Sequence, residues 1–169
     1  MKEQTYRSMV DAIESVPLMK QYIIWFNRIV TGAVYLLYPA LLVMLYLTKN
    51  DGLLPAVVIP GISFILLSIV RDRINKPRPY EVFDLEPIIN KKTSGHSFPS
   101  RHIFCMFLIA VTVFYFYPLA GVLIGLVGVA LAVNRVMGGV HFVRDVVAGA
   151  LCGIFCGIIG FYVILPLIH

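Results

Sequence analysis

The chain has 169 residues, of which 59% are hydrophobic and 14% charged, and its formal net charge at pH 7 is +5. The hydrophobic share exceeds the roughly one half that is usual in soluble domains, and the mean hydropathy is +0.87. This composition excludes an ordinary soluble enzyme and indicates one compact membrane-embedded unit. No soluble basic domain or aromatic-basic platform remains outside the apolar runs, so nucleic acid is not an expected partner.

The N-terminal region is polar and lacks the apolar core of a cleavable signal peptide. Within Met9–Trp25, apolar residues are mixed with charges, a pattern that favours an amphipathic helix lying on the membrane surface over a membrane span. Pro17 is expected to kink or divide this helix. We therefore assign residues 1–28 to an amphipathic interfacial helix and residues 29–169 to a membrane-embedded domain.

Five apolar runs follow, and each is close to the length of about 20 residues that a spanning helix needs. We expect spans at 29–48, 53–70, 99–116, 119–137 and 146–168, the third and fourth being separated at Tyr117-Pro118. A sixth span results if the N-terminal helix also crosses the membrane. The predicted fold is all-α, a polytopic membrane helix bundle with five to six transmembrane helices plus the N-terminal amphipathic helix.

Residues 71–98 form the one long polar connection, and long loops in compact proteins are usually functional or disordered. With five spans, this loop and the turn 138–145 lie on the same membrane face. All of the 14 Lys and Arg residues except Lys49 then lie on that side. Positive charge gathered at one mouth of a bundle is what an anion-binding site needs.

Three polar clusters stand at the ends of the apolar runs on that face. They are Arg71-x6-Arg78-Pro79, Pro99-Ser100-Arg101-His102 and Asn134-Arg135-x5-His141-x3-Asp145. Arginine suits a bound phosphate, because its planar guanidinium donates two parallel hydrogen bonds and stays charged. An isolated arginine at a membrane boundary is more often a simple anchor, but the histidines that accompany these arginines favour an anion site.

The second and third clusters add the means for chemistry. Pro99-Ser100-Arg101-His102 opens a helix, whose first N–H groups attract anions, with Ser100 as the expected cap. His141 and Asp145 are four residues apart and would meet on a helix. A carboxylate bound to one imidazole nitrogen fixes the tautomer and makes the other nitrogen a nucleophile. The plainer alternatives are a capped helix with a stray histidine and a structural His–Asp pair.

The three clusters resemble the active-site motifs of the type 2 phosphatidic acid phosphatase family, which shares this pattern with vanadium haloperoxidases. The family's motifs are Lys-x6-Arg-Pro, Pro-Ser-Gly-His and Ser-Arg-x5-His-x3-Asp, and the likeness covers about residues 53–168. This chain carries Arg71 for Lys, Arg101 for Gly and Asn134 for Ser. His96 offers a rival Ser-Gly-His match, but we prefer His102, which follows Pro-Ser and leads directly into an apolar helix.

The resemblance implies a multi-pass phosphatase of the cell membrane, with residues 29–169 as its phosphatase domain. Its partner would be a phosphorylated lipid such as phosphatidic acid, phosphatidylglycerophosphate or an isoprenoid diphosphate. His141 would attack phosphorus to form a phosphohistidine, Asp145 would orient it, and His102 would protonate the leaving oxygen. The substrate-binding residues would be Arg71, Arg78, Ser100, Arg101 and Arg135.

No metal or other cofactor is expected. The three cysteines lie in apolar runs and should pack as small hydrophobic side chains, and three acidic residues of the long loop should be solvated carboxylates. The cysteines are Cys105, Cys152 and Cys156, and the acidic residues are Glu81, Asp84 and Glu86.

Two other functions stay open at this point. Altered residues in all three motifs could make the chain a catalytically impaired phospholipid-binding protein, although such a protein has no need of His102, His141 and Asp145. A transporter or channel would place charges inside its spans. The resemblance places the site on the extracytoplasmic face, whereas the positive-inside rule places the same arginines in the cytoplasm. The sequence leaves the membrane face and the oligomeric state open.

Overall fold

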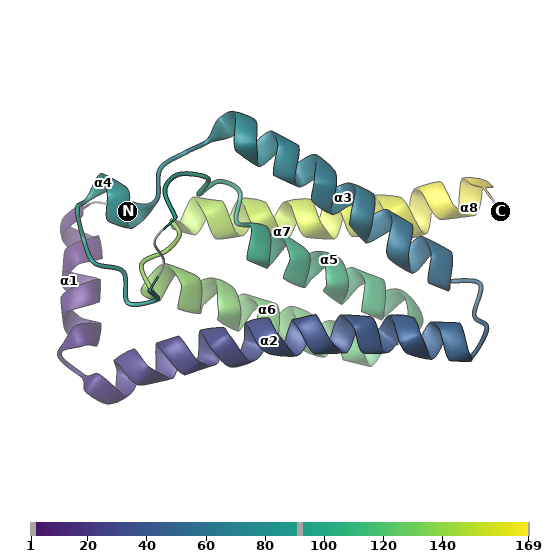
Figure 1. The fold of residues 1–169 in the computed structure, drawn as a ribbon, viewed down its shortest axis with the longest axis horizontal. Coiled ribbons are helices and arrows are strands. Elements are labelled where there is room, and N and C mark those ends of the chain that lie inside the picture. The colour runs from purple at the N-terminus through teal and green to yellow at the C-terminus, as the bar shows by residue number, and fades with distance from the viewer. Residues whose placement is uncertain (1–2, 91–92, 169) are drawn as a thin grey trace.

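The computed structural model describes residues 3–90 and 93–168, which form a bundle of helices and, within those ranges, no strand (Figure 1). The elements are α1 (Glu3–Glu14), α2 (Pro17–Leu47), α3 (Leu53–Ile74), α4 (Pro79–Val82), α5 (Arg101–Phe116), α6 (Pro118–Met137), α7 (Val143–Ile158), the π-helical segment η1 (Ile159–Ile164) and α8 (Leu165–Ile168). The predicted all-α membrane bundle is confirmed, and α5 gives way to α6 at the predicted Tyr117-Pro118 break.

Four helical segments of the described chain are long and apolar enough to cross a membrane, compared with the five to six predicted. They are Pro17–Leu47, Leu53–Val82, Pro118–Met137 and Val143–Leu167. The remaining apolar helix, α5, has 16 residues and lies in the middle of the bundle, where Ile103 and Phe104 are fully buried. Its neighbours α6 and α7 shield much of it, so α5 is the central element on which the others pack.

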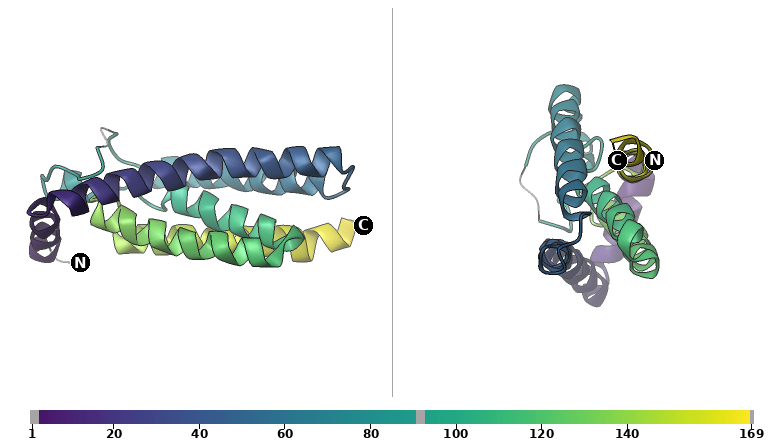
Figure 2. Two further views of the ribbon diagram at one scale, coloured as in Figure 1. Left: turned by 90° about the horizontal axis from the view of Figure 1, so that it is seen from below. Right: turned by 90° about the vertical axis from the view of Figure 1, so that its right-hand side faces the viewer.

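The N-terminal helix is shorter than the sequence suggested. In α1, the buried residues Tyr6, Val10 and Ile13 form one stripe and face the bundle, and the helix lies across the bundle's end (Figures 1 and 2). The chain divides at Pro17, which begins α2 at a first-turn position where its missing N–H breaks no helical bond. The boundary expected at residue 28 therefore falls inside α2.

Helix α2 combines the second half of the expected surface helix with the first expected span. Its 31 residues extend over about 46 Å at 1.5 Å per residue, which exceeds the roughly 30 Å of a bilayer's hydrocarbon core. The guanidinium of Arg28 lies 5.2 Å from the ring centroid of Trp25 near the start of this helix. The extra length accommodates these amphipathic residues without a break in the helix.

Glycines bring α7 against α5 at the point where two of the motifs meet. A Cβ on Gly149 would lie 2.6 Å from the carbonyl oxygen of Ser100, and a Cβ on Gly153 would lie 2.5 Å from that of Phe104. Larger residues would push the two backbones apart. The close approach lets the backbone N–H of Ser100 donate to the carbonyl of Asp145 at 2.8 Å.

The two ends of the bundle differ in content. Helices α1 and α4, the loop before α5 and the loop before α7 gather at one end, whereas the α2–α3 turn and the C-terminal helix lie at the other (Figure 1). The long loop and the 138–145 turn thus share an end, as the sequence predicts. Helices α2 and α3 diverge from their turn toward that end (Figure 1).

Candidate active site

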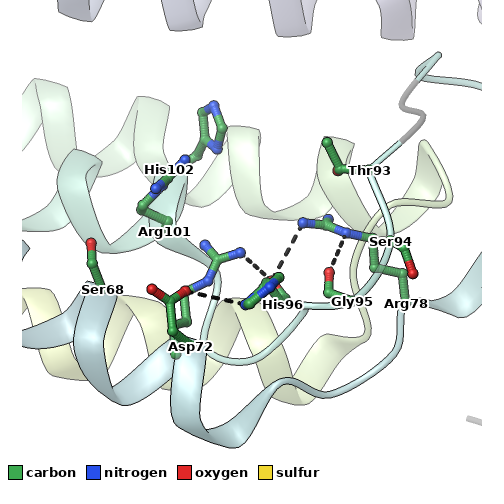
Figure 3. A pocket seen from close by; sticks show the side chains of 10 residues that line it. Ser68, Asp72, Arg78, Thr93, Ser94, Gly95, His96, Arg101 and His102 are labelled. Atoms are coloured by element: carbon green, nitrogen blue, oxygen red, sulfur yellow. Dashed lines mark hydrogen bonds and ion pairs between the residues drawn. The ribbon is translucent and has the colours of Figure 1, made fainter.

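A polar cavity of about 210 Å³ lies at the loop-rich end of the bundle, between the last turns of α3, the loop before α5 and the first turn of α5 (Figure 3). Its walls are formed by Ser68, Arg71, Asp72, Arg78, Thr93, Ser94, Gly95, His96, Arg101 and His102. Four of the predicted site residues therefore meet in one cavity although they come from two separate motifs.

Backbone carbonyls hold two of the arginines in place. Arg71, in the last turn of α3, donates from Nη2 to the carbonyl of His96. Arg78 is 2% exposed and donates to the carbonyls of Gly95 at 3.0 Å and Val140 at 3.1 Å. Carbonyls orient these guanidinium groups without neutralising their charge, which leaves a strongly positive wall in a poorly hydrated place.

The loop before α5 folds around a second His–Asp pair. His96 has a positive φ of 52°, its N–H donates to Asn75 Oδ1 at 3.1 Å, and its Nδ1 lies 3.2 Å from Asp72 Oδ1. Figure 3 shows His96 between Asp72 and Arg78. The sequence placed His96 in a loop outside the catalytic pair; the structure puts it in that loop but on the wall of the cavity.

Glu81 organises this loop, although the sequence suggested a solvated carboxylate. Its carboxylate accepts from the backbone N–H of Arg78 at 2.7 Å, the hydroxyl of Ser94 at 2.6 Å and the N–H of Gly95 at 2.9 Å. One carboxylate thereby joins the start of α4 to the segment that supplies carbonyls to Arg78. Sequence spacing offered no signal for this contact, because it depends on how the loop folds back.

The third motif forms a buried histidine–carboxylate pair. His141 is 1% exposed and its Nδ1 lies 3.7 Å from Oδ2 of the fully buried Asp145. The same oxygen accepts from Ser97 Oγ at 2.5 Å and from the N–H of Phe142 at 3.1 Å. The pair does not sit on one helix as expected, because His141 precedes α7 and only Asp145 lies in its first turn.

Ser97 is a site residue that the sequence did not reveal. Its hydroxyl donates to the Asp145 carboxylate and lies 3.5 Å from His141 Nδ1. It links the loop before α5 to the third motif. The only signal in the sequence was its position two residues before Pro99.

Two predicted substrate-binding residues, Ser100 and Arg135, are buried beside the cavity and are not among its lining residues; neither is His141. Ser100 occupies the cap position of α5 but makes no side-chain cap bond, and its Oγ has no hydrogen-bond partner in the described structure. Arg135 Nε also lacks a hydrogen-bond partner there. Unpaired buried donors are costly, so both groups are suited to an anion.

Asn134, by contrast, donates to the carbonyl of Ile23 at 3.3 Å and thus faces α2.

Helix α1 supports the third motif from outside. The ring of Tyr6 lies 5.5 Å from that of Phe83 and 6.4 Å from that of Phe142, and Arg7 Nη2 donates to the carbonyl of Phe83 at 2.7 Å. Burial, followed by the negative charge of Asp145, raises the pKa of Tyr6, which keeps its hydroxyl neutral. The sequence did not connect this helix with the site.

An apolar groove of about 480 Å³ begins where the polar cavity ends. It lies between α2, α3 and α5, and residues such as Val34, Leu42, Val57, Pro60, Gly61 and Phe64 line it. Arg101 and His102 line both the groove and the polar cavity. A single ligand can therefore bind with its charged group in the polar cavity and its long hydrocarbon tail in the apolar groove, passing Arg101 and His102.

A model of the PAP2 superfamily matches residues 52–168. The chain belongs to this superfamily. It is 30% identical over 125 residues to the bacitracin transport permease protein BcrC of Bacillus licheniformis, covering 72% of this chain but 62% of that protein. It is 30% identical over 155 residues to phosphatidylglycerophosphatase B of Bacillus subtilis, covering 77% of this chain and 71% of that protein.

Two solved structures share the fold. The crystal structure of Aquifex aeolicus LpxE has a TM-score of 0.74 and 27% sequence identity, with 94% of this chain and 93% of that chain covered. A PAP2-type phosphatidylglycerolphosphate phosphatase from Bacillus subtilis has a TM-score of 0.59 and 23% identity, which supports the fold alone. Together with the apolar helices, family membership makes the chain a multi-pass membrane protein.

Proposed function

We propose that the protein is an integral membrane lipid phosphatase that hydrolyses a phosphate monoester or diphosphate of a lipid. The observation that carries this proposal is the meeting of a cationic cavity and an apolar groove at Arg101 and His102. A soluble phosphate ester has no use for a groove of this kind, whereas a phospholipid or an isoprenoid phosphate fills both parts. The name of the phosphatidylglycerophosphatase relative supports the same class of substrate.

The proposed reaction begins with attack on phosphorus by His141. Because Nδ1 of His141 faces Asp145 and Ser97, we assign the attack to Nε2. The new N–P bond forms as the bond from phosphorus to the lipid-side oxygen breaks, and its electron pair leaves with that oxygen. For an ester, His102 supplies the proton that turns the leaving alkoxide into an alcohol.

The second half of the reaction returns the enzyme to its first state. Water attacks the phosphohistidine, the N–P bond breaks, and inorganic phosphate is released while His102 accepts a proton from the water. Arg71, Arg78 and Arg135 hold the equatorial oxygens in both steps, and Ser100 adds a hydroxyl donor. The proposed mechanism uses these side chains and no metal ion.

A lipid-binding protein without turnover is the second candidate, and one observation favours it. Neither His141 nor Arg135 lines the cavity, so the candidate nucleophile lies behind its walls. For catalysis, the phosphoryl group must reach beyond the residues that line the cavity to contact His141. For binding alone, the three arginines that line the cavity, Arg71, Arg78 and Arg101, suffice.

Release of inorganic phosphate from the protein purified in detergent separates the two functions. Phosphatidic acid, phosphatidylglycerophosphate and an isoprenoid diphosphate are supplied with excess chelator. We expect release from at least one lipid by the native protein and none by His141→Ala. Lipid binding without any release would establish the second candidate. Activity that disappears on chelation and returns with Mg²⁺ would overturn the metal-free mechanism.

We also propose that α1 lies on the membrane surface and that the embedded phosphatase domain extends from α2 to the C-terminus. Reporter fusions at the two ends of the chain, scored in intact cells, give the membrane face of the site. Helix α1 lies at the loop-rich end of the bundle (Figure 1). A reporter close to the N-terminus therefore reports the side on which the cavity opens.

A further inference from the structure

We infer that Arg101 is a specificity-determining residue that adapts the site to lipid diphosphates by neutralising the phosphate that departs with the lipid. The inference rests on the proposed phosphatase function and names the substrate within it. Arg101 is the first residue of α5 and stands where the matching family motif has glycine. Its side chain is exposed and lines both the polar cavity and the apolar groove.

The bonding of Arg101 differs from that of the other two cavity arginines. Arg71 and Arg78 are held by backbone carbonyls. The guanidinium of Arg101 lies 5.6 Å from the ring centroid of Phe64, and within residues 3–90 and 93–168 it makes no hydrogen bond or ion pair. Five N–H donors are therefore available to a ligand at the junction of cavity and groove.

The charge of the cavity points the same way. Three arginines line it, and the one lining carboxylate in the described chain, Asp72, is paired with His96. The positive charges of Arg101 and Arg71 repel each other. Placing a third cation beside two others is unfavourable in the empty cavity and becomes favourable when more than one anionic group is bound. A single phosphoryl group already has Arg71 and Arg78 as partners.

The position of the breaking bond explains why the additional anion belongs to the leaving group. With the tail in the groove and the phosphate end of the lipid entering through the cavity, the lipid-side oxygen lies at their junction, beside Arg101 and His102. In a monoester this oxygen leaves as an alkoxide and needs a proton. In a diphosphate, the bond between the terminal phosphorus and the bridging oxygen breaks, and the electron pair leaves with a lipid monophosphate that carries its charge into the reach of Arg101.

This arrangement predicts unequal losses when the charge is removed. Removing Arg101 should reduce kcat/KM for a lipid diphosphate by about 30-fold and for the monophosphate of the same lipid by about 3-fold, since charge-assisted hydrogen bonds are the strong ones. The resulting tenfold loss of selectivity corresponds to about 1.4 kcal/mol. The monophosphate also loses activity, because Arg101 contributes to the potential of the whole cavity.

The test compares farnesyl diphosphate with farnesyl monophosphate, which have identical tails, in initial-rate assays on Arg101→Gly, Arg101→Gln and Arg101→Lys. Glycine restores the family residue, glutamine removes the charge but keeps a helix-forming side chain, and lysine keeps the charge. We expect the first two variants to lose selectivity for the diphosphate and the lysine variant to keep most of it. The glutamine variant keeps the test decisive if the glycine variant does not fold.

The outcomes separate failure of this inference from failure of the proposed function. If the native protein hydrolyses both substrates and the neutral variants lose the same factor on each, Arg101 does not select diphosphates and only the inference fails. It fails in the same way if the lysine variant loses selectivity as fully as the glutamine variant. If the native protein hydrolyses neither substrate, the proposed function fails and the inference falls with it.

Discussion

The two ends of the bundle pair their polar groups in different ways. At the α2–α3 turn, polar contacts are local: Thr48 Oγ1 donates to the carbonyl of Met44 at 2.8 Å, and Asn50 Oδ1 accepts from the N–H of Gly52 at 2.8 Å. At the loop-rich end, contacts join distant segments, as when Arg78 reaches Val140 and Ser97 reaches Asp145. The residues of this turn thus complete their hydrogen bonds within the turn itself and the helix before it.

The α2–α3 turn connects two helices without a network of buried charges, so the need to connect helices does not by itself account for the charges at the loop-rich end. Burying an arginine, a histidine and an aspartate is expensive unless each finds a partner, and replacing such groups by apolar ones is often neutral or stabilising. At the α2–α3 turn, the chain connects two helices without buried charged groups of this kind. The buried charges at the loop-rich end are therefore better explained by a ligand than by stability.

The largest expected effect comes from removing the candidate nucleophile. His141→Ala should abolish phosphoenzyme formation and reduce turnover by about a millionfold, the scale seen when a catalytic nucleophile is deleted. Acid-quenched protein incubated with ³²P-labelled lipid measures the phosphoenzyme directly. The matched control is Thr48→Ala at the α2–α3 turn. This variant should keep turnover within a factor of about two, because the exposed Thr48 hydroxyl donates hydrogen bonds only to carbonyls of α2.

Persistence of the labelled phosphoenzyme in His141→Ala would place the nucleophile elsewhere. Turnover as low in Thr48→Ala as in His141→Ala would mean that the two ends of the bundle do not differ in function.

The two cavity histidines provide the next largest effect. His102→Ala should reduce turnover on a lipid monoester by about 10²–10⁴-fold, the usual contribution of a general acid. His96→Ala should cost less than about tenfold, because Arg71 and Arg78 bind the backbone carbonyl of His96, which the substitution preserves. Initial rates of phosphate release compare the variants, and circular dichroism shows whether both fold. The reverse order would assign the second motif to Ser94-Gly95-His96.

The convergence of the motifs could be predicted from the sequence because it depends on spacing and span length alone. Apolar runs of the right length fixed the hairpins, and hairpins bring alternate connections to the same end. Arg71, Arg78, Arg101 and His102 accordingly line one cavity. The roles assigned to them, and those of His141, Asp145, Ser100 and Arg135, remain predictions.

What the sequence could not predict depends on how the loops fold back. Glu81, Ser97 and Tyr6 reach partners on distant segments, and no local pattern encodes a contact of that kind. The division at Pro17 was anticipated, but the boundary expected at residue 28 falls inside α2, because the amphipathic residues after the proline continue into the apolar run as one helix. His141 was expected on a helix, since four-residue spacing fits a helical turn, but a short extended segment before α7 brings it to Asp145 as well.

A smaller effect should follow from loosening α1. Tyr6→Ala removes a fully buried ring packed against Phe83 and Phe142 and should lower kcat by about tenfold, as expected when a packing defect misplaces a reacting group by a fraction of an ångström. Tyr6→Phe keeps the ring and should retain most of the activity. A kcat loss with unchanged KM separates misplacement of His141 from weakened lipid binding. Equal activity in Tyr6→Ala and the native protein would show that α1 does not support the site.

The smallest expected effect tests the groove that distinguishes this site from a pocket for soluble phosphates. Gly61 lines the groove and a Cβ there meets nothing within 4 Å, so Gly61→Leu places a side chain in the groove without an immediate clash. We expect KM for a long-chain lipid phosphate to rise about fivefold, since a displaced apolar tail loses roughly 0.8 kcal/mol for each CH₂ left in water. A short-chain phosphate should be unaffected because it does not reach this depth. Gly125→Leu is the matched control, because a Cβ on Gly125 also meets nothing within 4 Å and Gly125 is not among the groove's lining residues. Equal changes in KM for both chain lengths, or for both variants, would mean that the tail binds somewhere other than between α2, α3 and α5.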